Sequence, residues 1–113
     1  MMKVACLLLV SVVLGSVVAT DAAAVGWKPI KNIKDPHVAE IANYAVTEHD
    51  RRSGQKLKLQ KVVKGDTQVV AGINYRLILA ATDASSTRNY EAIVWEKAWL
   101  HFRNLTSFTS LFD

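Results

Sequence analysis

Cysteine is nearly absent from this 113-residue sequence, and the single Cys6 lies in an apolar stretch at the N-terminus. We expect that stretch to be removed as a signal peptide, which leaves a mature chain without any thiol. The absence of thiols excludes a disulfide-held fold, a cysteine nucleophile and a cysteine-based metal site. Such a chain must be stabilised by its apolar core alone, which is feasible at about 90 residues.

Catalytic motifs are absent as well. The sequence contains no Gly-x-Ser-x-Gly, no His-Glu-x-x-His and no glycine-rich phosphate loop. Its three histidines, His37, His49 and His101, are scattered, and we interpret them as surface or half-buried packing residues. Glu40 and Glu48 would lie about 12 Å apart along a helix, too far for a glycosidase pair. The sequence therefore predicts no enzyme, no cofactor and no metal site.

The apolar N-terminus has the organisation of a secretory signal peptide. Lys3 is the one charge in residues 1–19, and it precedes an apolar run over residues 4–14 that is too short for a bilayer, which needs about 20 apolar residues. Small residues favour cleavage after Ala19. The alternative, an N-terminal core helix, would need a cap and a polar face that this stretch lacks. We therefore expect a secreted protein, extracellular or vacuolar, with no membrane partner after signal removal.

Proline is scarce, and both prolines mark boundaries. Pro29 assigns the extended segment 27–33 to a sheet edge. Asp35-Pro36 predicts a helix start, with the aspartate as N-cap and the proline at the first helical position. Apolar residues at helical spacing then predict a helix over residues 36–52, ended by Gly54.

The rest of the chain is typical of β-structure. Alternation after Leu57 and the segments 69–81, 90–95 and 100–108 predict about four antiparallel strands, and the polar residues 82–89 predict a loop. One amphipathic helix on a sheet with one apolar face indicates a two-layer α+β domain. We expect this domain to span residues 27–113, preceded by a flexible N-terminal arm at residues 20–26.

Two apolar connections stand out, because turns are normally polar. Gln68-Val69-Val70-Ala71-Gly72 and Ala98-Trp99 each join predicted strands. They are separated by one other connection, so in a meander they lie at the same end of the sheet. Exposed apolar turns suggest a contact surface, and Trp99 would be a good anchor in a cleft. A second interpretation stays open, in which Trp99 packs on the core and the valine pair continues a strand.

Basic residues offer a different function. Lys56, Lys58, Lys61 and Lys64 follow Arg51-Arg52, in a chain with a formal charge of +4. Such lysines on a strand usually provide solvation and edge protection, and no aromatic residues are interleaved with them as single-strand binding would require. We therefore expect no nucleic-acid partner, and binding of another polyanion is kept as an alternative.

Four segments, in order, resemble the cystatins. Residues 68–72 match the Gln-x-Val-x-Gly loop of that family, and residues 41–49 (Ile-Ala-Asn-Tyr-Ala-Val-Thr-Glu-His) resemble the helix signature of the plant cystatins, or phytocystatins. Residues 26–30 are similar to the family's N-terminal glycine and first strand. Ala98-Trp99 stands where the family usually has Pro-Trp. The resemblance covers residues 26–108.

The resemblance implies an antiparallel sheet of four to five strands wrapped around one long helix. It also implies a reversible, tight-binding inhibitor of papain-like cysteine proteases, which occludes the protease cleft with a wedge made of the N-terminal arm, a first loop at residues 68–72 and a second loop at Ala98-Trp99. The alternative within the same fold is a secreted binding module without a protease target. The protease-binding residues that the resemblance implies are Gly26, Gln68, Val69, Val70, Ala71, Gly72, Ala98 and Trp99.

The sequence and the resemblance also bear on glycosylation, oligomeric state and biological role. Asn104-Leu105-Thr106 is an N-glycosylation sequon, so Asn104 is a possible glycosylation site in a secreted chain. A monomer is expected, and the resemblance implies that a domain-swapped dimer can form. Plant defence and control of endogenous proteases are both compatible with the resemblance.

Overall fold

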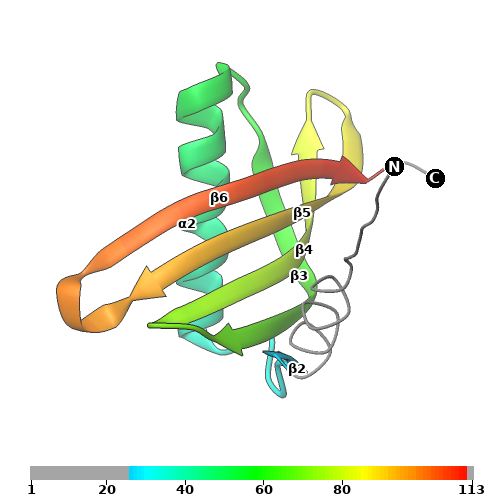
Figure 1. The fold of residues 1–113 in the computed structure, drawn as a ribbon. Helices are drawn as coiled ribbons and strands as arrows, with labels where there is room; N and C mark the ends of the chain where they lie inside the picture. The colour runs from blue at the N-terminus through cyan, green and yellow to red at the C-terminus, as the bar shows by residue number, and fades with distance from the viewer. Residues whose placement is uncertain (1–25, 112–113) are drawn as a thin grey trace, which may run out of the picture.

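Within residues 26–111, one long helix lies across a five-stranded antiparallel sheet (Figure 1). The computed structural model describes residues 26–111. The predicted signal peptide at 1–19 and all of the predicted arm except Gly26 lie outside the described residues. Within the described part of the chain, no helix has the length and apolarity needed to cross a membrane.

The sheet is a meander in which each strand pairs with the next one along the chain. Its order is β2-β3-β4-β5-β6, and every neighbouring pair is antiparallel. This confirms the predicted α+β class and the upper bound of four to five strands. The strands are β2 (Trp27–Pro29), β3 (Lys58–Val69), β4 (Ile73–Asp83), β5 (Ser86–Lys97) and β6 (Phe102–Leu111).

The helix α2 (Pro36–Ser53) forms where the proline and its preceding aspartate predicted it. The Asp35 side chain accepts a hydrogen bond from the backbone N–H of His37 at 2.8 Å, as an N-cap does. At the other end, Gly54 adopts a left-handed conformation with φ +80° and donates its N–H to the Asp50 carbonyl. Both predicted helix boundaries are therefore confirmed to within one residue.

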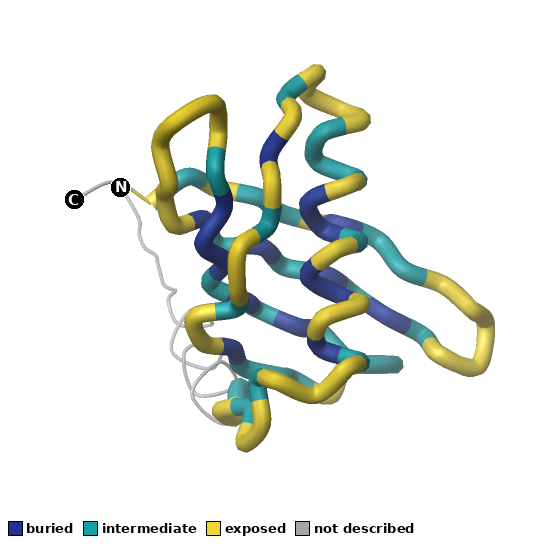
Figure 2. Tube along the Cα trace, turned by 180° about the vertical axis from the view of Figure 1, so that it is seen from behind, coloured by how far each residue is buried: buried dark blue, intermediate teal, exposed yellow. Residues whose placement is uncertain are grey.

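The core lies between one face of α2 and the concave face of the sheet (Figure 2). The predicted apolar stripe of the helix is buried, and the sheet side is made mainly by alternating residues of β4 and β5. This packing fixes the helix and the sheet as one rigid body, from whose end the strand connections project. The fully buried large side chains are Ile41, Leu77, Leu79 and Val94.

The prediction of a loop at residues 82–89 is wrong. β4 runs to Asp83 and β5 begins at Ser86, so only Ala84 and Ser85 connect them. Polar residues are tolerated in these strands because they extend past the core into solvent, where Thr82 pairs with Thr87 and their hydroxyl oxygens lie 3.0 Å apart. The polar residues of this segment therefore indicate exposure to solvent and not a turn.

The predicted lysine cluster lies on an open strand edge. Within the described residues, β2 pairs with β3 only at residues 66–68, so the first half of β3 has no partner on that side. Lys58, Lys61 and Lys64 are exposed along this edge, and two register irregularities interrupt its pairing with β4. Charged residues and bulges on an edge oppose intermolecular strand pairing, which agrees with the interpretation as edge protection.

A charged cluster closes the C-terminal end of α2. Glu48 accepts hydrogen bonds from Arg51 and from Arg52, whose Nε lies 3.0 Å away, and Arg52 also donates to the Leu105 carbonyl at 2.9 Å. The hydrogen bond from Arg51 is the largest cause that lowers the pKa of Glu48 from 4.5 to about 2. The cluster thereby ties the end of the helix to β6.

This lowered pKa predicts acid sensitivity. The folded pKa of Glu48 lies below the unfolded value, so the stabilisation is complete above pH 4.5 and is lost as the pH falls from 4.5 to about 2. We expect Glu48→Gln to melt at a lower temperature than the wild type near neutral pH. The gap between the two melting temperatures, followed by circular dichroism, should shrink across that acid window. A gap that stays constant down to about pH 2 would contradict the assignment.

Candidate functional site

The two apolar connections lie side by side at one end of the sheet, as the meander predicted (Figure 1, green and orange turns). The first loop joins β3 to β4, and the second loop is a 3-10 turn, η1 (Ala98–Leu100), that joins β5 to β6. β2 pairs with the last residues of β3, which brings Gly26 to the same end. The fold therefore brings the two loops and Gly26, the one described residue of the predicted arm, to the same end of the sheet.

The first loop is a tight turn whose geometry requires a glycine. Val70 donates its N–H to the Gly72 carbonyl at 3.0 Å, Ala71 has φ +37° and Gly72 has φ +115°. A Cβ on Gly72 would also collide with the backbone oxygen of Glu96. Conformation and space both exclude a side chain at this position.

Trp95 fixes the first loop to the neighbouring hairpin. Its indole Nε1–H lies 3.2 Å from the carbonyl oxygens of both Val70 and Ala71, so it donates to the turn itself. The ring is held in turn by Phe102, whose ring packs edge-on at 5.6 Å, and by the Lys97 ammonium at 4.3 Å. The first loop is therefore preorganised by β5 and β6.

The start of the described chain packs against the base of the first loop. Trp27 pairs with Gln68, and a Cβ on Gly26 would collide with the Gln68 side chain. Gln68 accepts a hydrogen bond from Asn74 at 3.3 Å, which holds its side chain beside Gly26. Gly26 thus lies against the Gln68 side chain, with no room for a side chain of its own.

The second loop presents its aromatic side chain to solvent. Trp99 is 65% exposed and Leu100 is 60% exposed, and the turn ends at His101 with φ +50°. Trp99 therefore does not pack on the core, and the alternative in which it does is wrong. The valine pair is divided: Val69 is the last residue of β3 and pairs with Ile73, whereas Val70 lies beyond the strand, in the turn.

Together the loops form an exposed apolar surface on an otherwise polar end of the molecule. Val69 is 82% exposed, more than any other large apolar residue of the described chain, and Trp99 of the second loop is 65% exposed. Contiguous apolar side chains of this kind indicate a binding surface. The surface holds no candidate nucleophile, and within residues 26–111 no group of three or more His, Cys, Asp or Glu side chains could hold a metal ion.

Asn104 lies in β6, paired with Trp95, and is partly exposed. Thr106 of the same sequon donates its hydroxyl to the Ile93 carbonyl at 3.1 Å. Glycosylation of Asn104 stays a prediction.

Two features of the site were missed from the sequence. The sequence predicts only that Trp95 lies in a strand, whereas its indole organises the first loop. The sequence also carried no sign that His37, Glu96 and Arg103 meet beneath the second loop, since they come from three separate elements. A tryptophan next to a predicted apolar turn was the one available signal.

Comparisons with known proteins place the chain among proteinase inhibitors. A family model described as "Aspartic acid proteinase inhibitor" matches residues 30–111. Cysteine proteinase inhibitor 5 of Arabidopsis thaliana is 54% identical over 110 residues, which cover 94% of this chain and 90% of that protein. Cysteine proteinase inhibitor 1 of Actinidia chinensis var. chinensis is 55% identical over 86 residues, or 76% and 74% of the two chains.

Solved structures give the same fold. A salivary cystatin from the soft tick Ornithodoros moubata superposes with a TM-score of 0.68 at 18% identity, over 77% of this chain and 97% of that one. The squash aspartic acid proteinase inhibitor superposes with a TM-score of 0.62 at 30% identity, over 78% and 95%. Relatives above half identity, the shared fold and the matching loop motifs agree, and the chain belongs to the plant cystatins.

Proposed function

We propose that this protein is a reversible inhibitor of papain-like cysteine proteases, which it blocks with the wedge formed by Gly26, the first loop and the second loop. The observation that carries the proposal is the convergence of these three segments at one end of a rigid sheet, with Val69 and Trp99 exposed. The curated relatives at 54–55% identity, which are named cysteine proteinase inhibitors, support the same activity.

The geometry suits an inhibitor that is bound without being cleaved. A protease cuts a peptide only when a carbonyl carbon is held in line with the nucleophile. Two adjacent turns can fill a cleft on both sides of the nucleophile without offering a carbonyl in that position. Because the first loop is already held by Trp95, it loses little conformational entropy on binding, which favours high affinity.

Inhibition of papain tests the proposal. The mature chain should inhibit papain reversibly and stoichiometrically at micromolar concentration or below, with activity recovered on dilution. A chain that is folded by circular dichroism but leaves papain fully active would refute it. Secretion is part of the same proposal, and N-terminal sequencing of protein secreted from plant cells should begin at Thr20.

Aspartic proteinase inhibition is a second candidate, favoured by one specific observation. The matching family model is described as an aspartic acid proteinase inhibitor, and the squash inhibitor with that name shares the fold at 30% identity. Pepsin should therefore be assayed beside papain. Inhibition of pepsin but not of papain would show that the protein is an aspartic proteinase inhibitor. The greater identity to cysteine proteinase inhibitors favours papain as the target.

Polyanion binding is a further alternative, which the exposed lysines on the open edge of β3 would support. Retention on heparin that falls steeply with salt, in a chain that inhibits neither protease, would favour that function over inhibition. The exposed lysines of this edge lie away from the wedge, so the two activities can be separated by mutation.

Replacing Ala98 by proline should tighten inhibition. Ala98 is the first residue of η1, and Lys97 before it is extended, with φ −119° and ψ 93°. A proline is accommodated at such a position and reduces the conformations that the free second loop must give up. We expect Ala98→Pro to bind papain about 0.5–1 kcal/mol more tightly. Inhibition constants of the two proteins check this, and an equal or larger constant for the variant would contradict it.

A further inference from the structure

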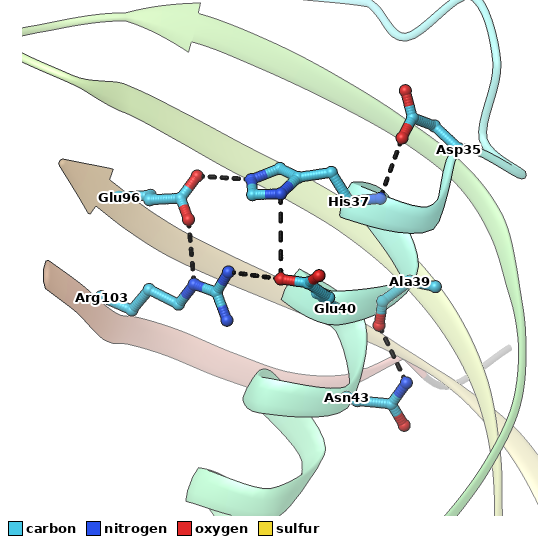
Figure 3. Close-up of polar contacts among 7 residues, drawn as sticks. All are labelled: Asp35, His37, Ala39, Glu40, Asn43, Glu96 and Arg103. Atoms are coloured by element: carbon cyan, nitrogen blue, oxygen red, sulfur yellow. Dashed lines mark hydrogen bonds and ion pairs between the residues drawn. The ribbon is translucent and has the colours of Figure 1, made fainter. Parts of the chain in front are cut away.

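Four charged or titratable side chains from α2, β5 and β6 interact with one another (Figure 3). Two of them, Glu96 and Arg103, lie on the two strands that the second loop joins. The carboxylate of Glu96 lies 2.7 Å from His37 Nε2 and accepts a hydrogen bond from Arg103 Nε at 2.9 Å. Arg103 also donates to Glu40 at 2.8 Å, and His37 Nδ1 lies 3.9 Å from the same Glu40 oxygen. His37 and Glu40 belong to the first turns of α2, whereas Glu96 and Arg103 belong to β5 and β6.

Glu96 is the buried centre of this cluster. Its side chain is 8% exposed, compared with 29% for Arg103, 43% for His37 and 61% for Glu40. A buried carboxylate is costly unless it is fully paired, and here each oxygen has its own partner. Burial alone would raise the pKa of Glu96, but the hydrogen bonds from His37 and Arg103 outweigh it and hold that pKa below its ordinary value.

The cluster stands at both ends of the second loop. Glu96 lies two residues before the start of η1, and Arg103 follows η1 within the next strand. A cavity of about 560 Å³ separates the loop from the helix, so the loop does not rest on packed apolar side chains. The cluster joins its two stems to α2, together with the Tyr44 hydroxyl of α2, which donates to the Arg103 carbonyl at 3.1 Å. The residues that line the cavity are His37, Tyr44, Glu96, Ala98, His101 and Arg103.

Glu96 also adjoins the first loop. Its backbone oxygen is the atom that leaves no room for a side chain on Gly72. The neighbouring Trp95 donates to the carbonyls of that loop. A displacement of Glu96 would therefore move the supports of both loops together.

We propose that Glu96, clamped between His37 and Arg103, is a positioning residue of the inhibitor, which sets the angle of the second loop against the helix and so directs Trp99. The inference rests on the proposed function. Glu96 itself touches no protease, because it is buried behind the loop; its effect on binding passes through Trp99.

The test compares Glu96→Gln with a matched variant at the other end of the helix. Glu48→Gln also removes one carboxylate from a charged cluster. In that cluster the partners of the glutamate are Arg51 and Arg52, and the cluster is remote from the loops. We expect Glu96→Gln to weaken papain inhibition about tenfold, mainly through faster dissociation. Glu48→Gln should lower the melting temperature and leave the inhibition constant within about twofold.

A double-mutant cycle separates positioning from general destabilisation. If Glu96 acts by directing Trp99, Glu96→Gln should change inhibition by less than about twofold in a Trp99→Ala background. Full additivity of the two substitutions, or unchanged inhibition by Glu96→Gln in the wild-type background, would overturn the inference. Failure of the wild type to inhibit would instead overturn the proposed function, and this inference with it.

If Glu96→Gln does not fold, His37→Ala tests the same positioning role of Glu96. His37 is partly exposed, so its truncation leaves the core intact while it removes one of the two partners of Glu96. We expect an inhibition constant about threefold larger, again only when Trp99 is present. An effect of the same size in the Trp99→Ala background would contradict the role.

Discussion

Gly72→Ala is expected to weaken inhibition of papain by about 100-fold or more, the largest loss from any single methyl group in this chain. Gly72 has φ +115°, where a residue with a Cβ is strained by about 1–3 kcal/mol. The added Cβ would also meet the backbone oxygen of Glu96, which cannot rotate away as a side chain could. The turn must therefore open or shift, and Val69 and Val70 move with it. Inhibition constants and the far-ultraviolet spectrum of the variant measure the effect.

Gly54→Ala is the matched control. Gly54 is also left-handed, with φ +80°, but nothing lies within 4 Å of where its Cβ would be, and it caps the far end of α2. We expect Gly54→Ala to lose about 1 kcal/mol of stability through backbone strain and to inhibit as the wild type does. If both variants lost inhibition equally, general destabilisation would explain the result, and the first loop would have no special part in binding.

The elements of the fold that are governed by local chemistry were predictable. Asp35-Pro36 and Gly54 determine the helix ends, because capping and left-handed backbone are properties of those residues themselves. The adjacency of the two loops follows from meander topology alone. The extent of β4 and β5 was not predictable, because Thr82 and Thr87 are polar and owe their strand conformation to cross-strand pairing beyond the core.

The supports of the loops depend on tertiary contacts, which explains why the sequence did not reveal them. His37 and Glu96 are 59 positions apart, and neither has a neighbour in the sequence that predicts the pairing. The sequence identifies the surface that would meet a protease through its apolar turns, but it does not identify what holds that surface in place. Under the proposed function, inhibition depends both on that surface and on the contacts that hold it in place.

Trp99→Ala is expected to weaken inhibition about 30-fold, or about 2 kcal/mol, which is the scale of an aromatic anchor at the centre of an interface. Trp99 is 65% exposed in the free protein, so its removal takes little from the fold. The melting temperature should therefore stay close to that of the wild type while the inhibition constant rises. Because the lost contact forms only in the complex, the change should appear mostly as faster dissociation.

Leu111→Ala is the control for Trp99→Ala. It tests whether the loss of inhibition depends on the position of Trp99 or only on the removal of an exposed apolar side chain. Leu111 is also an exposed apolar residue, but it is the last residue of β6, at the end of that strand farthest from the second loop. Its truncation should leave both the inhibition constant and the melting temperature nearly unchanged, within about 0.5 kcal/mol for the stability. If Trp99→Ala behaved like Leu111→Ala in a chain that inhibits papain, the second loop would not be part of the wedge. Binding would then rest on the first loop and the arm at Gly26 alone.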